Sequence, residues 1–141
     1  MKLKNTSVYL LAGWMLAACS GGGFQKTENG VVVEVKQQQP TDVRKVRLEV
    51  MGEKLIHVSA TPEKEFSKEQ SLIVIPQQNK TDFKVEEQGD EVTVKTSELC
   101  AIVSKTTGEV RFTDAGGKQI LAEDSDGRTF TPVEVAVVMS F

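Results

Sequence analysis

Aromatic side chains are scarce in this chain of 141 residues, and those best suited to stacking on sugars occur only at its beginning. The single tryptophan, Trp14, and the single tyrosine, Tyr9, both lie within the first 18 residues. Every later aromatic residue is a phenylalanine. Modules that bind sugars on their own usually stack pyranose rings on Trp or Tyr. The composition therefore disfavours an independent carbohydrate-binding module.

The chain also lacks an apolar run long enough to cross a bilayer as a helix, which takes about 20 residues. The apolar segment Val8–Leu16 is too short for this, and it follows Lys2 and Lys4. It leads into Leu16-Ala17-Ala18-Cys19, which has the form of a lipobox. A basic start, a short apolar segment and small residues before the cleavage point make up a secretory signal peptide. The pattern predicts a lipoprotein signal peptide over residues 1–18, with Cys19 as the lipid-attachment residue; a buried helix ending in cysteine is the alternative.

The residues after this signal predict a tether and a location. Residues 19–29 contain the lipidated cysteine and a Ser-Gly-Gly-Gly stretch, so we expect them to form a flexible link. Serine rather than aspartate directly after Cys19 favours a lipid anchor in the outer membrane of a bacterium. Whether the protein faces the periplasm or the cell surface stays open.

Histidine and cysteine are too few for a metal site or a disulfide. Once Cys19 carries lipid, His57 and Cys100 are the only residues of these two types. They cannot complete a zinc site, and one thiol cannot form an internal disulfide. Cys100 lies in an apolar run and is predicted to be a buried, inert thiol. His57 alternates with Ile56 and Val58 and is predicted to be a solvated strand residue.

Positive charge is not concentrated anywhere in the chain. Loss of Lys2 and Lys4 with the signal leaves 15 basic against 20 acidic residues, a net charge of −5. Neutralising phosphates requires clustered lysines and arginines. We therefore expect no nucleic-acid partner.

The rest of the chain alternates between apolar and polar residues with turn signals about every ten residues. This spacing predicts one all-β domain over residues 30–141, an antiparallel β-sandwich. The best helix candidate, Pro62–Gln70, is short and polar. The expected strands lie near residues 31–35, 46–50, 56–60, 72–75, 83–85, 92–94, 99–103, 110–112 and 120–121.

Four carboxylates lie close together in sequence and could suggest the paired acids of a glycosidase. Each is near turn glycines, where aspartate is favoured because its side chain bonds the local backbone. The Asp124–Gly127 stretch lacks the later acidic ligand of an EF-hand. We interpret all four as turn residues; they are Asp114, Glu123, Asp124 and Asp126.

Three segments, within residues 45–62, 98–123 and 126–132, together resemble the N-terminal part of glycoside hydrolase family 31 enzymes. Residues 45–50, followed by 55–58 and 60–62 (KVRLEV, LIHV and ATP), resemble the opening of such an enzyme. Glu98–Glu123 (ELCAIVSKTTGEVRFTDAGGKQILAE) resembles a hairpin of the family, and Asp126–Pro132 is similar to the loop after it. The resemblance covers about residues 30–132. Similar lipoprotein α-xylosidases and α-glucosidases occur in Bacteroides-type bacteria.

The resemblance implies a galactose-mutarotase-like N-terminal β-sandwich that packs on a (β/α)8 catalytic barrel. In the family the barrel carries both catalytic aspartates, and the nucleophile lies in a motif close to Trp-x-Asp-Met. That motif is absent here, and a barrel alone takes about 250 residues. We therefore expect no catalytic residue, no cofactor and no hydrolysis by this chain alone, while its substrate-binding residues stay unknown.

The sequence departs from the family at its end, where Val133–Phe141 is an apolar stretch. It is either a substitute last strand or out-of-frame sequence, and we expect the domain to be truncated before the barrel. An alternative is a free-standing surface lipoprotein that binds a glycan or a partner protein through its sheet edges.

Overall fold

The computed structural model describes residues 23–68, 80–124 and 128–133, and these residues form nine strands. No helix in this part of the chain is long and apolar enough to cross a membrane. The strands are β1 (Phe24–Thr27), β2 (Gly30–Glu34), β3 (Lys45–Gly52), β4 (Leu55–Thr61), β5 (Lys84–Gln88), β6 (Glu91–Lys95), β7 (Leu99–Ser104), β8 (Val110–Asp114) and β9 (Gln119–Ala122).

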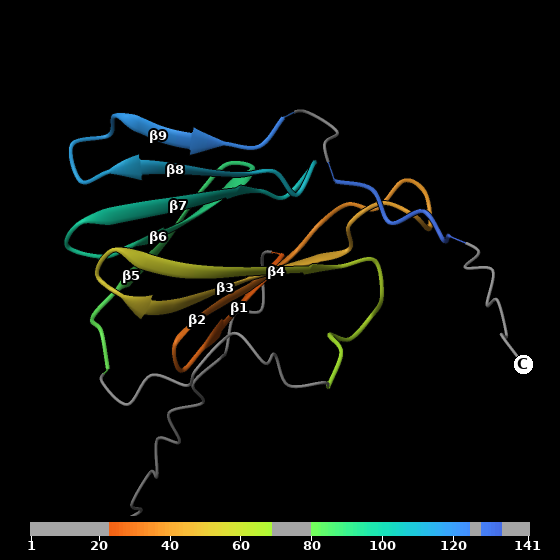
Figure 1. Cartoon of the computed structure of the whole chain (residues 1–141), viewed down its shortest axis with the longest axis horizontal. Helices are drawn as coiled ribbons and strands as arrows, with labels where there is room; N and C mark the ends of the chain where they lie inside the picture. Colours follow the sequence, from red (N-terminus) through yellow and green to blue (C-terminus); the bar gives the residue numbers. More distant parts are fainter. Residues whose placement is uncertain (1–22, 69–79, 125–127, 134–141) are drawn as a thin grey trace, which may run out of the picture.

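The strands form two antiparallel sheets (Figure 1). The first has the order β1-β2-β3-β4, and the second has the order β5-β6-β7-β8-β9. Strand β2 packs over β6, so the sheets lie face to face around one core. The predicted all-β antiparallel sandwich is confirmed.

The strand pairs follow the sequence pattern closely. Val50 pairs with Ile56 across the first hairpin, and Val85 pairs with Val94 across the turn at Gly89. Val103 pairs with Val110 in the next hairpin. In each hairpin the apolar residues face inward because side chains alternate between the two faces of a strand.

Strand β1 lies before residue 30, where the sequence predicts that the β-domain begins. Phe24–Thr27 lies within the range expected to be a tether, yet it pairs with β2 and Phe24 packs against the core. The folded part therefore begins earlier than the sequence pattern indicates. Residues 1–18, Cys19 and the expected strand at 72–75 lie outside the described residues, as does Asp126. Residues 62–68 of the helix candidate contain no helix.

The core consists mainly of valines. Those on the inner faces of β2, β6 and β7 are fully buried, and Leu48 of β3 is the largest side chain among the fully buried residues. Phenylalanines lie at the periphery of this cluster and are only partly buried. Short β-branched side chains suit the close spacing of about 10 Å between two packed sheets.

Hydrogen bonds join the two sheets at both ends of the sandwich. At one end the Lys36 amide donates to the carbonyl of Lys105 at 2.9 Å. At the other the buried Thr96 hydroxyl donates to the carbonyl of Glu53 at 2.6 Å. At each end, the bond holds a loop of the first sheet against a loop of the second sheet.

Gly108 allows the turn between β7 and β8 to approach the loop between β2 and β3. Its φ is +75°, a conformation that favours glycine. A Cβ atom there would lie 2.3 Å from Cγ1 of Val43, inside the core. The missing side chain thus sets the distance between these two segments.

We predict that Gly108→Ala lowers the free energy of unfolding by about 3 kcal/mol, from backbone strain and overpacking together. Gly89→Ala is the matched control, because Gly89 has φ +60° and a Cβ atom added there would meet nothing within 4 Å. It should cost about 1 kcal/mol, from strain alone. Urea denaturation of both variants measures the difference, and equal losses would contradict a steric role for Gly108.

Candidate functional site

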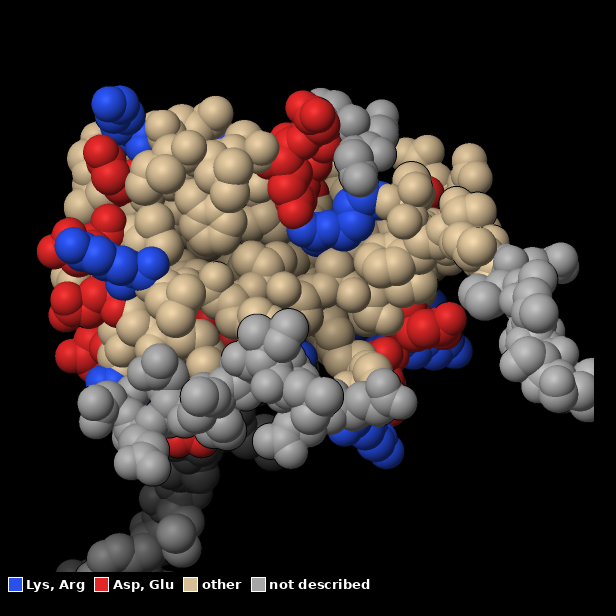
Figure 2. Space-filling model, viewed as in Figure 1, with Lys and Arg blue, Asp and Glu red and all other residues tan. Residues whose placement is uncertain are grey.

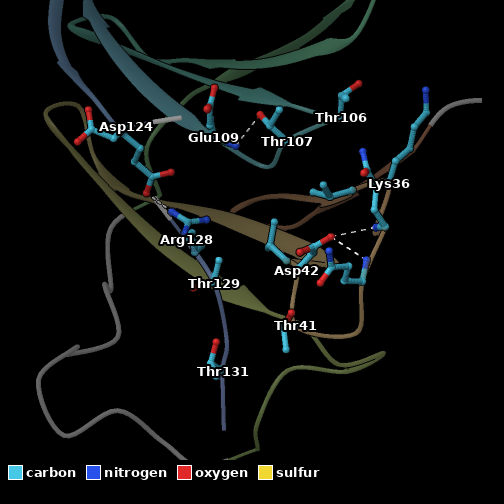
Figure 3. Close-up of a pocket in the computed structure, with 15 residues that line it drawn as sticks. Lys36, Thr41, Asp42, Thr106, Thr107, Glu109, Asp124, Arg128, Thr129 and Thr131 are labelled. Atoms are coloured by element: carbon cyan, nitrogen blue, oxygen red, sulfur yellow. Dashed lines mark hydrogen bonds and ion pairs between the residues drawn. The ribbon is translucent and has the colours of Figure 1, made fainter. Parts of the chain in front are cut away.

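A cavity of about 390 Å³ lies at the end of the sandwich where Gly108 is placed. Three segments surround it: the β2–β3 loop, the β7–β8 turn and the chain after β9 (Figure 3). Its walls carry threonine hydroxyls and carboxylates together with two cations, Lys36 and Arg128. The lining therefore combines polar and charged groups with apolar surface, to which Val35 and Val43 contribute.

Asp42 organises the β2–β3 loop. Its Oδ2 accepts hydrogen bonds from the backbone amides of Gln38 at 3.1 Å and Gln39 at 2.8 Å. The Gln37 side chain donates to the carbonyls of Asp42 and Pro62 at 2.8 and 3.2 Å. The loop is consequently tied both to itself and to the chain just after β4.

The segment after β9 is attached to this loop by backbone contacts. The Phe130 amide donates to the Thr41 carbonyl at 2.8 Å, and Thr129 forms an antiparallel bridge with Asp42. Phe130 packs against the core. These contacts place Thr129 and Thr131 on the cavity wall.

Glu123 joins strand β8 to the segment after β9, and it does not have the turn role that its position suggests. Its Oε2 accepts a hydrogen bond from the Val110 amide at 2.9 Å, and its Oε1 pairs with the guanidinium of Arg128. Asp114 does have the predicted turn role, since its Oδ1 accepts from the amides of Gly116 and Lys118, both at 2.9 Å. Asp124 lies on the cavity wall.

A second charged cluster adjoins the cavity at the β7–β8 turn. The hydroxyl of Thr106 donates to Asp90, and this hydrogen bond lowers the pKa of the carboxyl below its ordinary value. The positive charges of Lys36 and Lys105 act in the same direction, whereas desolvation opposes them. Lys105 also pairs with Glu87 at 2.6 Å.

His57 has polar contacts with neighbouring side chains that the sequence does not indicate. Its Nδ1 lies 3.0 Å from Oε2 of Glu49, and the same oxygen lies 3.3 Å from Nε of Arg47. Arg47 in turn lies over the ring of Phe66, 4.5 Å from its centre. His57 thus lies on the outer face of β4 as a strand residue, as predicted, and its side chain, 33% exposed, is also part of a charged network that the sequence pattern does not reveal. Cys100 is buried, as predicted.

The arrangement fits polar binding better than acid–base catalysis. Asp42 and Glu123 are committed to structural hydrogen bonds, so neither is a free acid or base. Among the described residues no group of three or more His, Cys, Asp or Glu side chains is placed to hold a metal ion. The threonine hydroxyls and the carboxylate of Asp124 could hydrogen-bond a hydroxyl-rich ligand.

Two solved structures to which this chain is similar are α-xylosidases of glycoside hydrolase family 31. One, from Xanthomonas citri, is 39% identical over 79% of this chain with a TM-score of 0.70. Another, from a soil metagenome and solved in complex with xylose, is 24% identical over 75% of this chain with a TM-score of 0.57. This chain spans only 12% and 15% of the lengths of those proteins. No protein-family model matches the sequence.

We predict that Asp90→Asn lowers the melting temperature slightly at pH 7, because it removes a carboxylate held by Thr106 and two cations. A lowered folded-state pKa stabilises the fold above the ordinary pKa of the carboxyl, and this contribution disappears as the pH falls through the folded-state value. The melting temperatures of parent and variant should therefore converge in acid. Asp82→Asn, at an exposed position, serves as the control; a difference for Asp90→Asn that is independent of pH would contradict the assignment.

Proposed function

We propose that this chain is the N-terminal β-sandwich domain of a family 31 α-glycosidase-like protein and performs no hydrolysis itself. The observation that carries the proposal is the 39% identity to the Xanthomonas citri α-xylosidase over 79% of the chain. Two proteins can share a β-sandwich architecture with little sequence identity, so an identity of 39% over 79% of the chain supports a closer relation than a common fold. The domain would support a (β/α)8 barrel that supplies the catalytic carboxylates, and the xylosidase neighbours favour xylosides as the substrate class of the whole enzyme.

The structure of the cavity agrees with a domain that lacks chemistry of its own. Two of its four carboxylates, those of Asp42 and Glu123, hold loops together through backbone hydrogen bonds. A retaining or inverting glycosidase needs two carboxyl groups that can exchange protons or attack the sugar. Carboxylates fixed in this way would lose their structural role if they were protonated.

The function is tested by an assay of the full chain on aryl α-xyloside and aryl α-glucoside. We expect no turnover of either substrate, and turnover that persists after repeated purification would overturn the proposal. Thermal melts with xylose test the alternative, a free-standing glycan-binding lipoprotein, for which the polar cavity is the favouring observation. Stabilisation by xylose that Asp124→Ala abolishes would favour that alternative.

A second part of the proposal is that Cys19 carries a lipid and anchors the domain to a membrane, with the outer membrane as the favoured location. The motif Leu16-Ala17-Ala18-Cys19 behind a short apolar segment supports this. Expression in a bacterium with radiolabelled palmitate should label the chain and place it in the membrane fraction. Cys19→Ser should lose the label, whereas Cys100→Ser should retain it; labelling that survives Cys19→Ser would contradict the anchor.

A further inference from the structure

Among the residues that the structure describes, one side of the sandwich has no covering strand. The second sheet has five strands and the first has four, and β2 packs over β6. This alignment sets β4 opposite β8, so no strand in the described part of the chain faces β9. Figure 1 shows β8 and β9 extending beyond the edge strand β4.

Apolar side chains on the inner faces are left uncovered on this side. The register puts Leu121 of β9 on the same face as Phe112 and Ala101, yet Leu121 is 60% exposed. Across from them, Val58 and Ala60 of β4 are only partly buried, although their partners on β3 are fully buried. Figure 2 shows that the atoms exposed over much of this side belong to uncharged residues.

The chain after β9 reaches the end of β4. Phe130 is bonded to Thr41, and the loop containing Thr41 is tied through Gln37 to Pro62, the residue that follows β4. Val133, three residues after Phe130, is 81% exposed. The segment that begins at Val133 thus follows a stretch bonded to the loop that is tied to the C-terminal end of β4, and no described strand pairs with the outer edge of β4.

The sequence of that segment has the pattern of a strand with one apolar face. Alternate positions from Val133 to Phe141 carry only large apolar side chains, and the four positions between them are glutamate, alanine, valine and serine. Nine residues in extended conformation span about 30 Å, which exceeds the roughly 23 Å of the seven residues of β4. The segment is therefore long enough to follow β4 from end to end.

We propose that Val133–Phe141 forms a strand antiparallel to β4 along its free edge and covers the inner face of β8 and β9. The first sheet would then have five strands, as the second has. The large apolar side chains of the segment would contact Phe112 and Leu121, while β4 would gain a hydrogen-bonded neighbour. This inference depends on the fold and not on the proposed glycosidase role.

Hydrogen exchange measured by mass spectrometry on the full chain tests the proposal. The β4 amides that point away from β3 should be protected, and Val135→Lys with Val137→Lys should speed their exchange at least about tenfold by opening this edge. Ala136→Lys with Ser140→Lys, which adds the same charge on the opposite face, is the matched control and should preserve protection. Amides of β6 report whether each variant is folded and should stay protected in both.

Three results would overturn the proposal. Rapid exchange of the β4 amides that point away from β3 in the parent chain would show that the edge is free. Equal effects of the two lysine pairs would show that no particular face of the segment is buried. Protection that appears only at concentrations where sedimentation detects a dimer would assign the edge to a second copy.

Discussion

The structure depends on one constraint: each sheet must bury one face against the other at close spacing. Because side chains alternate along a strand, a shift of one residue would turn the buried face outward, and in β3 it would replace Val46 and Leu48 in the core by Arg47 and Glu49. The constraint therefore fixes the register of the hairpins as well as the inner faces. Valine fills most of the narrow space, and the larger phenylalanines remain at the periphery, where the sheets leave more room.

This constraint explains why the sequence predicts most of the fold. Strands such as β3 and β6 show the period-2 pattern within their own residues, so their inner faces can be assigned without knowledge of the partner strand. Strand β1 lacks such a pattern, since Phe24 is its only large apolar residue. Its strand conformation comes from pairing with β2, and local sequence does not reveal that contact.

The candidate site was less predictable for the same physical reason. Glu123 meets the Val110 amide through the bulged pairing of β8 and β9, and His57 meets Glu49 across the β3–β4 pair. These partners become neighbours only after the strands have paired. The cavity itself needs three loops from separate parts of the chain. Residue types near a turn predicted Asp114 correctly, because its partners lie within four residues.

The two sides of the sandwich have different surfaces, which bears on how the domain is used. The edge strand β5 carries Lys84, Glu86 and Glu87, and charged side chains on an edge prevent pairing with other strands. The opposite edge strand, β9, carries Ile120 and Leu121 and no charged residue, and both side chains are more than half exposed. The charged side chains of β5 favour exposure of that edge to water, whereas burial of the apolar side chains of β9 would stabilise the fold. The segment Val133–Phe141, placed along β4 as proposed above, would contact Leu121, whereas Ile120 lies on the opposite face of β9 because side chains alternate along a strand.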